Sequence, residues 1–135
     1  MKDPSGEVIS AFYTALNGKC TLPVYSMVPR DVDDFIFIGD ITCVGDVAKD
    51  RYITNNTIQI EIIKTYRDQG SKVAVNAISN TILGIIRNAF ASTVTLTSFT
   101  VPLVVLDSMT DFVEETDEYK VFRKLIRFRL IIEEK

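Results

Sequence analysis

The stretch that decides the fold is YKVFRKLIRFRLII, residues 119–132, near the end of the 135-residue chain. One set of alternate positions is apolar: Phe122, Ile126, Phe128, Leu130 and Ile132. The other set carries Arg123, Arg127 and Arg129. Because successive side chains of a β-strand point to opposite faces of a sheet, this pattern predicts a half-buried strand with one apolar and one basic face.

Three further long strands are predicted upstream. Phe35–Val44 is rich in β-branched and aromatic residues, and Gly39-Asp40 inside it is typical of a bulge. Tyr52–Tyr66 carries isoleucines at alternate positions 58, 60 and 62, with polar residues between them. Val101–Phe112 is joined to the last strand, Tyr119–Ile132, by an acidic turn over residues 114–118. Both pairs of neighbouring strands predict hairpins.

Two helices are predicted from apolar residues at helical spacing. The first spans Ser5–Leu16, with Asp3 or Ser5 as its cap and Asn17-Gly18 as its end. The second runs from Ser71 to about Asn88, and Gly84 inside it predicts a close packing contact. Its expected core stripe is Ala74, Ala77, Ile78, Thr81, Ile82, Ile85 and Ala89.

The remaining segments are less regular. Leu22–Pro29 is bracketed by prolines, which favours a short edge strand or a strand-like lead-in. Residues 91–100 are small and rich in Ser and Thr, and fit either a strand or an ordered loop. The predicted order is α-β-β-β-α-β-β, in a single domain over residues 1–135. Strands grouped in hairpins predict an α+β fold, with a mainly antiparallel sheet of four to five strands and two helices packed on it.

Composition excludes several function classes. Lys and Arg number 15 and Asp and Glu 18, and the net charge of −3 is not that of a general nucleic-acid binder. The chain has no His, which removes imidazole-activated nucleophiles and the usual imidazole metal ligands. The start MKDPSGEV carries no apolar run, and no apolar stretch is long enough to span a membrane. We therefore expect a soluble protein without membrane contact, with Cys20 and Cys43 as reduced thiols.

No catalytic, metal or cofactor pattern is present in the sequence. Asp31, Asp33 and Asp34 lack the spacing of a calcium loop and predict a solvated turn. Gly39 and Gly45 are too far apart for a phosphate-binding loop. The sequence therefore predicts a protein that is not an enzyme and has no cofactor.

Three charged features are candidate contact sites. The basic face of the last strand is either a solvent-facing surface paired with Gln59 and Glu61, or a surface that meets an acidic neighbour or lines a pore. The excursion from Val44 to Asn56 is either a flexible tip or an arm that orders on a neighbouring subunit. The acidic run from Asp111 to Glu118 is either an exposed hairpin tip or a patch facing a basic neighbour. The candidate interface residues are Lys49, Arg51, Tyr52, Glu114, Glu115, Glu118, Arg123, Arg127 and Arg129.

Several short stretches together resemble a known family. They are the opening Met1-Lys2-Asp3-Pro4 and helix, Leu22-Pro23-Val24-Tyr25 leading to Val28-Pro29, Phe35-Ile36-Phe37-Ile38-Gly39, Ile58–Tyr66, Arg67-Asp68-Gln69-Gly70-Ser71-Lys72, and the second helix with Asn76, Ile78 and Leu83. With the order of elements, they make nearly the whole chain similar to the tail-completion, or tail-terminator, proteins of tailed bacteriophages. Residues 91–100 and the basic last strand have no counterpart in this pattern, which leaves the ring position open among terminator, neck adaptor and another connector.

The resemblance implies an α+β subunit of a closed ring, commonly a hexamer, that joins the tail tube to the head connector. It implies assembly in the bacterial host cytoplasm and a place in the neck or tail of the virion, with DNA passing through the lumen without base-specific contacts. A ring subunit needs two different surfaces that bind head-to-tail. If the basic strand face and the acidic turn are those surfaces, charge reversal at Arg127 and Arg129 weakens assembly and leaves the monomer folded.

Two other functions remain open from the sequence. One is a monomeric or dimeric adaptor that binds a protein partner through its long hairpin or an edge strand. The other is a small-ligand domain, which requires a pocket lined by Tyr25, Phe37 and Tyr66.

Overall fold

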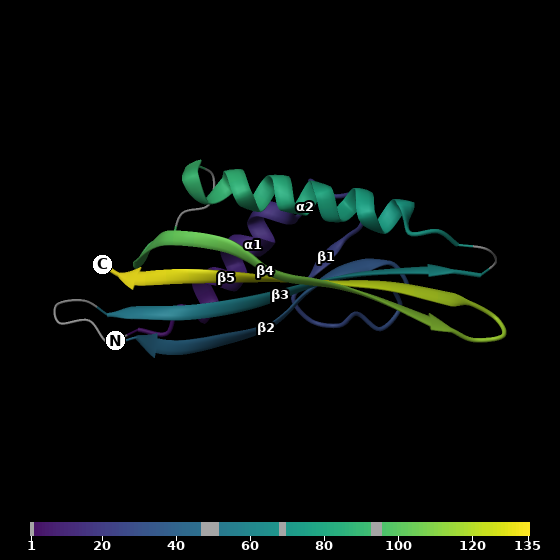
Figure 1. Ribbon diagram of the computed structural model, residues 1–135, viewed down its shortest axis with the longest axis horizontal. Helices are drawn as coiled ribbons and strands as arrows, with labels where there is room; N and C mark the ends of the chain where they lie inside the picture. Colours follow the sequence, from purple (N-terminus) through teal and green to yellow (C-terminus); the bar gives the residue numbers. More distant parts are fainter. Residues whose placement is uncertain (1, 47–51, 68–69, 93–95) are drawn as a thin grey trace.

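A computed structural model of the chain describes residues 2–46, 52–67, 70–92 and 96–135 (Figure 1). The chain folds as two helices and five strands in the order α-β-β-β-α-β-β. The elements are α1 (Ser5–Leu16), β1 (Val24–Tyr25), β2 (Phe35–Asp46), β3 (Ile53–Tyr66), α2 (Val73–Ser92), β4 (Phe99–Glu115) and β5 (Lys120–Glu134). The predicted α+β class and element order are confirmed.

The five strands form one sheet in the order β1-β2-β3-β5-β4. The four long strands pair antiparallel, whereas the two-residue β1 pairs parallel with β2 at one edge. The last strand, β5, therefore lies between β3 and β4. The bulge predicted at Gly39-Asp40 is confirmed by a register shift between Ile38 and Ile41.

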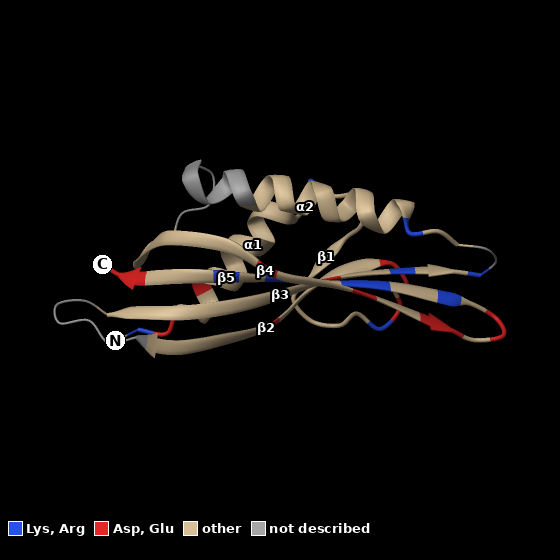
Figure 2. Ribbon diagram, in the orientation of Figure 1, with Lys and Arg blue, Asp and Glu red and all other residues tan. Residues whose placement is uncertain are grey.

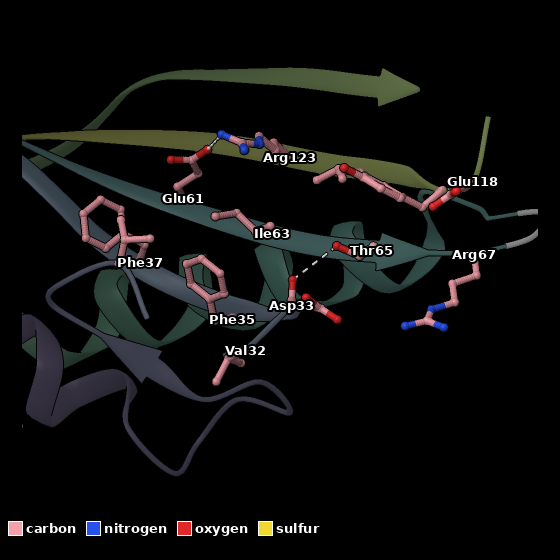
Figure 3. A pocket seen from close by; sticks show the side chains of 13 residues that line it. Val32, Asp33, Phe35, Phe37, Glu61, Ile63, Thr65, Arg67, Glu118 and Arg123 are labelled. Carbon is pink, nitrogen blue, oxygen red and sulfur yellow. Dashed lines mark hydrogen bonds and ion pairs between the residues drawn. The ribbon is translucent and has the colours of Figure 1, made fainter. Parts of the chain in front are cut away.

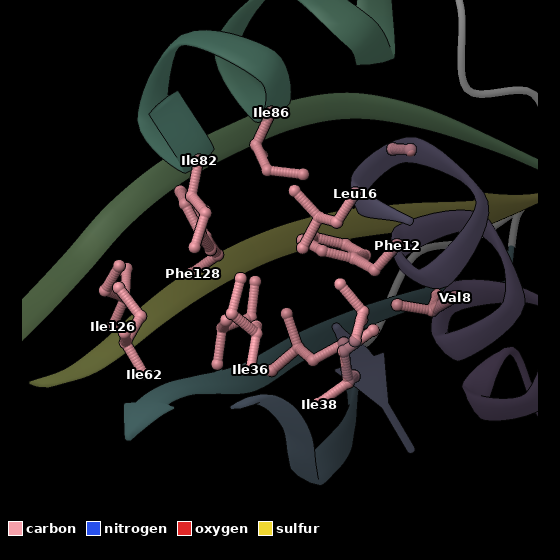
Figure 4. Close-up of a cluster of buried hydrophobic side chains, with 14 of the residues drawn as sticks. Val8, Phe12, Leu16, Ile36, Ile38, Ile62, Ile82, Ile86, Ile126 and Phe128 are labelled. Atoms are coloured by element: carbon pink, nitrogen blue, oxygen red, sulfur yellow. The ribbon is translucent and has the colours of Figure 1, made fainter. Parts of the chain in front are cut away.

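Both helices pack on the same face of the sheet (Figure 1). The core between them is built from the even-numbered residues of β3 and β5 and from the apolar stripes of the helices (Figure 4). Ile60, Ile126 and Leu130 are fully buried in it. At roughly 25 cal/mol per Å² of apolar surface, burial of these side chains is the main stabilising contribution, and it fixes which strand face is turned away from the helices.

Helix α1 has the bounds that its sequence predicts. Its N-cap is Pro4, which forms no side-chain cap, but the Asp3 carboxylate accepts a hydrogen bond from the Ser5 amide at 2.9 Å. Hydrogen bonds from Ser5 lower the pKa of Asp3. At the other end Gly18 has φ +79°, a left-handed conformation that glycine adopts without strain. Val8, Phe12, Ala15 and Leu16 are buried, as the stripe predicts.

The face of α2 that is buried differs from the predicted stripe. Val75, Ile78, Ser79, Ile82 and Ile86 are buried, whereas Ala77 and Thr81 are exposed and Ala74 and Ile85 are only half-buried. The bulky β-branched side chains set the orientation of the helix, because they remove more apolar area from water than alanines do. The predicted close contact at Gly84 is wrong, since a Cβ there would meet nothing within 4 Å.

Strands β2 and β4 extend further toward their hairpin turns than predicted, whereas β3 and β5 begin one residue later than predicted. Val44 pairs with Asn55 and Asp46 with Ile53, so both ends of the excursion predicted from Val44 to Asn56 form a regular ladder, and its centre, 47–51, lies outside the described residues. Residues 91–100 are divided between the end of α2, at Ser92, and the start of β4, at Phe99. The last turn covers only 116–119, since β4 continues through Glu115. Among the described residues, no helix is long and apolar enough to cross a membrane.

Candidate functional site

The sheet face that the helices leave uncovered carries the arginines of the last strand. Arg123, Arg127 and Arg129 alternate with the buried residues of β5 and therefore point away from α1 and α2. Charged residues concentrate toward the end of the sheet where the β4–β5 turn lies, whereas the opposite half of β2, β3 and β4 is nearly free of charge (Figure 2). The uncovered face and the sheet edges are thus the surfaces on which partner contacts must be sought.

Arg123 is held by carboxylates of its own chain. Its Nη1 lies 3.3 Å from Glu61 Oε1 on β3, and its Nε lies 3.7 Å from Glu114 Oε1 on β4. Glu61 is therefore a cross-strand partner of the basic face, as one of the two predicted alternatives requires. Exposed ion pairs of this kind contribute about 0–1 kcal/mol each, so they orient the guanidinium more than they stabilise the fold.

Arg127 and Arg129 lie farther along β5, toward the uncharged half of the sheet. Arg127 stands between Gln59 on β3 and Ser108 on β4, and its buried Nε has no hydrogen-bond partner among the described residues. Arg129 stands between Thr57 and Val105 and is exposed. The register thus places the two arginines on the open face beside Thr57, Gln59 and Ser108, which are polar, and Val105, which is apolar.

The acidic residues predicted as an interface lie at the β4–β5 turn. Glu115 pairs with Lys120 at 3.0 Å, and Glu114 pairs with Arg123. Glu118 is exposed and lines a groove on the open face. Two of the three carboxylates therefore already have a cation within their own hairpin. The acidic turn is also separated from Arg127 and Arg129 by several residues of strand.

The groove has a volume of about 700 Å³ and lies between the open face and the segment from Val28 to Asp33 (Figure 3). Its apolar floor is formed by Phe35, Ile63 and Val121, which make a second buried cluster with Val32 and Phe37 packed against it. Charged side chains line its rim: Asp33, Glu61, Arg67, Glu118 and Arg123. The predicted Arg face thus ends in a groove of mixed charge.

Asp34 anchors the segment that covers the groove. Its Oδ2 accepts a hydrogen bond from Lys64 Nζ at 2.8 Å, and its Oδ1 accepts one from the Thr65 amide at 2.7 Å. The hydrogen bond to Asp34 raises the pKa of Lys64. The predicted solvated turn is therefore wrong for Asp34, which is half-buried and bonded to β3, although Asp31 and Asp33 are exposed. Among the described residues, no group of three or more His, Cys, Asp or Glu side chains is arranged to hold a metal ion.

The pocket required for a small-ligand domain does not form. Tyr66 packs in the helix-covered core, where its ring lies 5.5 Å from that of Phe122. Tyr25 and Phe37 belong to the second cluster on the opposite face of the sheet. A side chain at an even position of β3 cannot share a pocket with the open face, so the three aromatic residues do not meet.

Two of the remaining predicted residues, Lys49 and Arg51, lie outside the described residues. Tyr52 is exposed, and its carbonyl accepts a hydrogen bond from the Glu134 amide at 3.0 Å, which ties the start of β3 to the end of β5. Cys43 is exposed on β2, whereas Cys20 is partly buried, and desolvation raises the pKa of its thiol.

Sequence reasoning missed strand β4 as a surface. Its large apolar side chains are exposed on both faces: Leu103, Leu106, Met109, Phe112 and Val113. The signal was present, because 101–112 (VPLVVLDSMTDF) carries apolar residues at both odd and even positions. A strand buried on one face only does not need that pattern, so the excess of apolar residues indicates a contact outside the subunit.

Comparisons with known proteins bear on this architecture. No protein-family model matches the sequence, and no curated protein matches it. A chain in the solved virion of a native gene transfer agent (GTA) particle is similar over 98% of this chain and 99% of that chain, with a TM-score of 0.75 and 15% identity. At this level of identity the likeness shows that the two chains share a fold over their full lengths.

Proposed function

We propose that this chain is a structural component of a phage-like virion, and that it forms a ring at the head–tail junction. In this role it acts as a tail-completion, terminator or neck-adaptor subunit that joins the tail tube to the head connector. Its partners are other copies of itself, six in the simplest case, and the tube and connector rings above and below. The ring would assemble in the cytoplasm of the bacterial host and remain in the neck or tail of the particle.

The observation that carries this proposal is the fold shared with a chain of the GTA virion, which extends over almost all of both chains. A full-length likeness supports a comparable unit of assembly better than a likeness of one motif does. The resemblance of several short stretches to tail-terminator proteins points in the same direction. Fold alone does not fix function, and the finer assignment therefore depends on the surfaces of this chain.

The arrangement of layers supports one orientation in the ring. Helices cover one face of the sheet, and the other face carries Arg127 and Arg129, with Thr57, Gln59, Ser108 and Val105 beside them on the neighbouring strands. We place this uncovered face toward the lumen, where guanidinium groups would contact the phosphates of passing DNA without reading its sequence. The carboxylates that pair with Arg123 moderate the positive charge, which suits DNA that must pass and not stay bound.

Native mass spectrometry over a concentration series, at low and moderate salt, tests the ring. A closed ring of six or more copies, formed alone or on adding tail tubes, is the expected result. Electron microscopy of tube ends with the protein added would then show it as a terminal ring. A monomer or dimer at every concentration that also ignores tubes and connectors would overturn the proposal.

The exposed edge of β4 favours one second candidate, a monomeric or dimeric adaptor. An edge strand with unpaired backbone groups can add a strand from a partner protein. The long hairpin between β2 and β3 is a weaker basis for this function, because its ladder is regular as far as Asp46 and Ile53. In the mass-spectrometry experiment the adaptor predicts no closed ring under any condition.

A further inference from the structure

We propose that the edge strand β4 of one copy packs against the open half of strand β2 in the next copy, joining the sheets of neighbouring subunits. The inference rests on the proposed ring and names the surfaces that close it. The contact would involve the start of β4, Thr100–Leu106, and the end of β2, Ile41–Asp46.

The first partner surface is β4, whose outer edge has no strand beside it among the described residues. Leu106 on the helix-facing side is 44% exposed, and Phe112 on the open face is 49% exposed. A second groove of about 370 Å³ runs between α2 and this strand, lined by Leu83, Ile86, Val104, Val105, Leu106 and Phe128. A long exposed apolar edge with a groove beside it is typical of a surface that another protein chain covers.

The second partner surface is the far edge of the same sheet. Strand β1 covers β2 only at Ile36 and Phe37, which leaves the stretch after the bulge without a neighbouring strand in the described structure. Within that stretch Cys43 is exposed and Val44 is 64% exposed. Each subunit therefore carries two different open edges, as a head-to-tail interface requires.

Strand direction favours pairing between these two edges. The long strands alternate in direction across the sheet, because β3 is antiparallel to β2, β5 to β3, and β4 to β5. The number of long strands is even, so β4 runs opposite to β2. In a ring all copies have the same orientation relative to the axis, and β4 of one copy therefore meets β2 of the next in antiparallel direction, the more stable pairing.

The heights of the two edges also agree. Following the register across the sheet, Ile41 lies level with Ile58, Phe128 and Leu106. Asp46 lies level with Ile53, Glu133 and Thr100 in the same way. The open stretch of β2 is thus level with the half of β4 that has no charged residue. In the acidic half of β4, Met109–Phe112 is level with Phe35–Ile38, the part of β2 before the bulge, and Val113–Glu115 extends beyond the start of β2.

Irregularities in β4 limit the pairing to a defined stretch. The ladder with β5 is interrupted between Thr100 and Leu103, where Pro102 lies, and again at Asp107, between Leu106 and Ser108. Proline cannot donate a backbone hydrogen bond, and an extra residue bends the strand. Leu103–Leu106 is therefore the regular segment available to the next copy, and its two boundaries fix the register.

Cysteine cross-linking tests this contact, because β2 already carries an exposed thiol at Cys43. In a Cys20→Ser background, Leu106→Cys places a second thiol on the helix-facing side of β4. Within one chain β2 and β4 are three strand spacings apart, roughly 14 Å, too far for a disulfide or a very short linker. Leu106 lies two residues beyond Val104, the residue level with Cys43, or about 7 Å along the strand, which is too far for a disulfide across the interface but within reach of a short bismaleimide. A short bismaleimide should therefore give a ladder of covalent species larger than the dimer on a denaturing gel.

The matched control is Val113→Cys, on the same strand and the same face. Val113 is similarly exposed, but it lies nine residues beyond Val104, the residue level with Cys43, or about 30 Å along the strand. It should give no ladder, and neither should Leu106→Cys combined with Cys43→Ser. Native mass spectrometry of each variant before cross-linking verifies that the ring is present.

Three results would overturn the inference. A ring that forms but gives no ladder with Leu106→Cys would contradict the β4–β2 contact and leave the proposed function intact. Cross-linking that stops at the dimer indicates a two-fold contact and not a head-to-tail one. Failure of every variant and of the unmodified chain to assemble, with or without tail tubes, removes the proposed function and this interface together.

Discussion

At the scale of single residues, packing around two glycines gives opposite expectations for the same substitution. A Cβ at Gly70 would lie 2.5 Å from the Tyr66 ring and 2.7 Å from the Phe122 ring, which already pack edge to face. Gly70→Ala should therefore lower the free energy of unfolding by about 1–3 kcal/mol. Gly84→Ala, at an exposed helical site with open space around it, should raise it by about 0.5–1 kcal/mol.

Chemical denaturation of the two variants measures both values. Equal effects, or stabilisation by alanine at Gly70, would mean that the aromatic pair moves aside at little cost. Neither outcome could be predicted from sequence, because Gly84 was the position expected to make a close contact. The rings of Tyr66 and Phe122 come together beside Gly70 only because β3 pairs with β5, so the sequence around Gly70 does not predict this contact.

The ion pair between Lys64 and Asp34 predicts a pH dependence at the same scale. Lys64 has a pKa above its usual 10.5 in the folded state, so the stabilisation is complete below that pH and is lost as the pH rises through the folded value. Lys64→Met should cost about 0.5–1 kcal/mol at pH 8, since the pair is partly exposed. The difference from the unmodified protein should shrink above about pH 10.5.

Unfolding titrations at pH 8, 9.5 and 11 check this expectation, with Lys72→Met as the matched control. Lys72 is exposed and has no ion pair among the described residues, so its loss should change stability by less than about 0.5 kcal/mol at any of these pH values. A pH-independent cost at Lys64 would assign its contribution to the alkyl chain and not to the charge.

At the scale of elements, two neighbouring isoleucines in α2 test which face of the helix is buried. Ile86 is fully buried against the sheet, whereas Ile85 is only partly buried. Ile86→Ala should lower the free energy of unfolding by about 2–5 kcal/mol, because it leaves a cavity. Ile85→Ala should cost about 1 kcal/mol, in proportion to its smaller buried area. Thermal or denaturant unfolding measures the two, and a reversed order would mean that α2 is rotated.

The bounds and buried faces of the helices and strands could be predicted where the local sequence alone determines them. Helix α1 has one clear stripe and a glycine stop, and its bounds agree with the sequence. Helix α2 has small and large apolar residues around most of its circumference, so only tertiary packing decides among them. The hairpin ends were underestimated because Thr, Asn, Asp and Glu were taken as turn residues, whereas the ladder pairs them across the strands.

At the scale of the whole molecule, the basic face of β5 separates two models of assembly. If Arg127 and Arg129 face the lumen, the double variant Arg127→Glu with Arg129→Glu should leave ring size unchanged and abolish salt-sensitive binding of short duplex DNA to the ring. Native mass spectrometry and a binding titration at two salt concentrations measure these effects. A folded monomer that no longer forms rings would instead assign these arginines to an acidic surface on the next copy.

The fold class could be predicted from the sequence because hairpin order and strand alternation are local properties. The surfaces of the assembly could not. Both parities of β4 are apolar, but only the sheet order shows that this strand lies at an edge with nothing beside it. The sequence placed Arg123, Arg127 and Arg129 on one face of β5, as the structure has them. The pairing of Arg123 with Glu61, 62 residues away, and with Glu114, across the hairpin, depends on the strand register and could not be predicted.

The interruptions in β4 have a consequence for the subunit before it meets any partner. Cross-β aggregation needs segments of about six or seven residues with high β-propensity, low charge and no proline. Pro102 and the irregularity at Asp107 divide the apolar half of β4 into a regular run of only four residues, Leu103–Leu106. Asp111, Glu114 and Glu115 place like charges along the other half, which would repel in a stacked fibril. The apolar run of β4 that would pair with the next copy is thus too short, and the rest of the strand too charged, to nucleate a cross-β fibril.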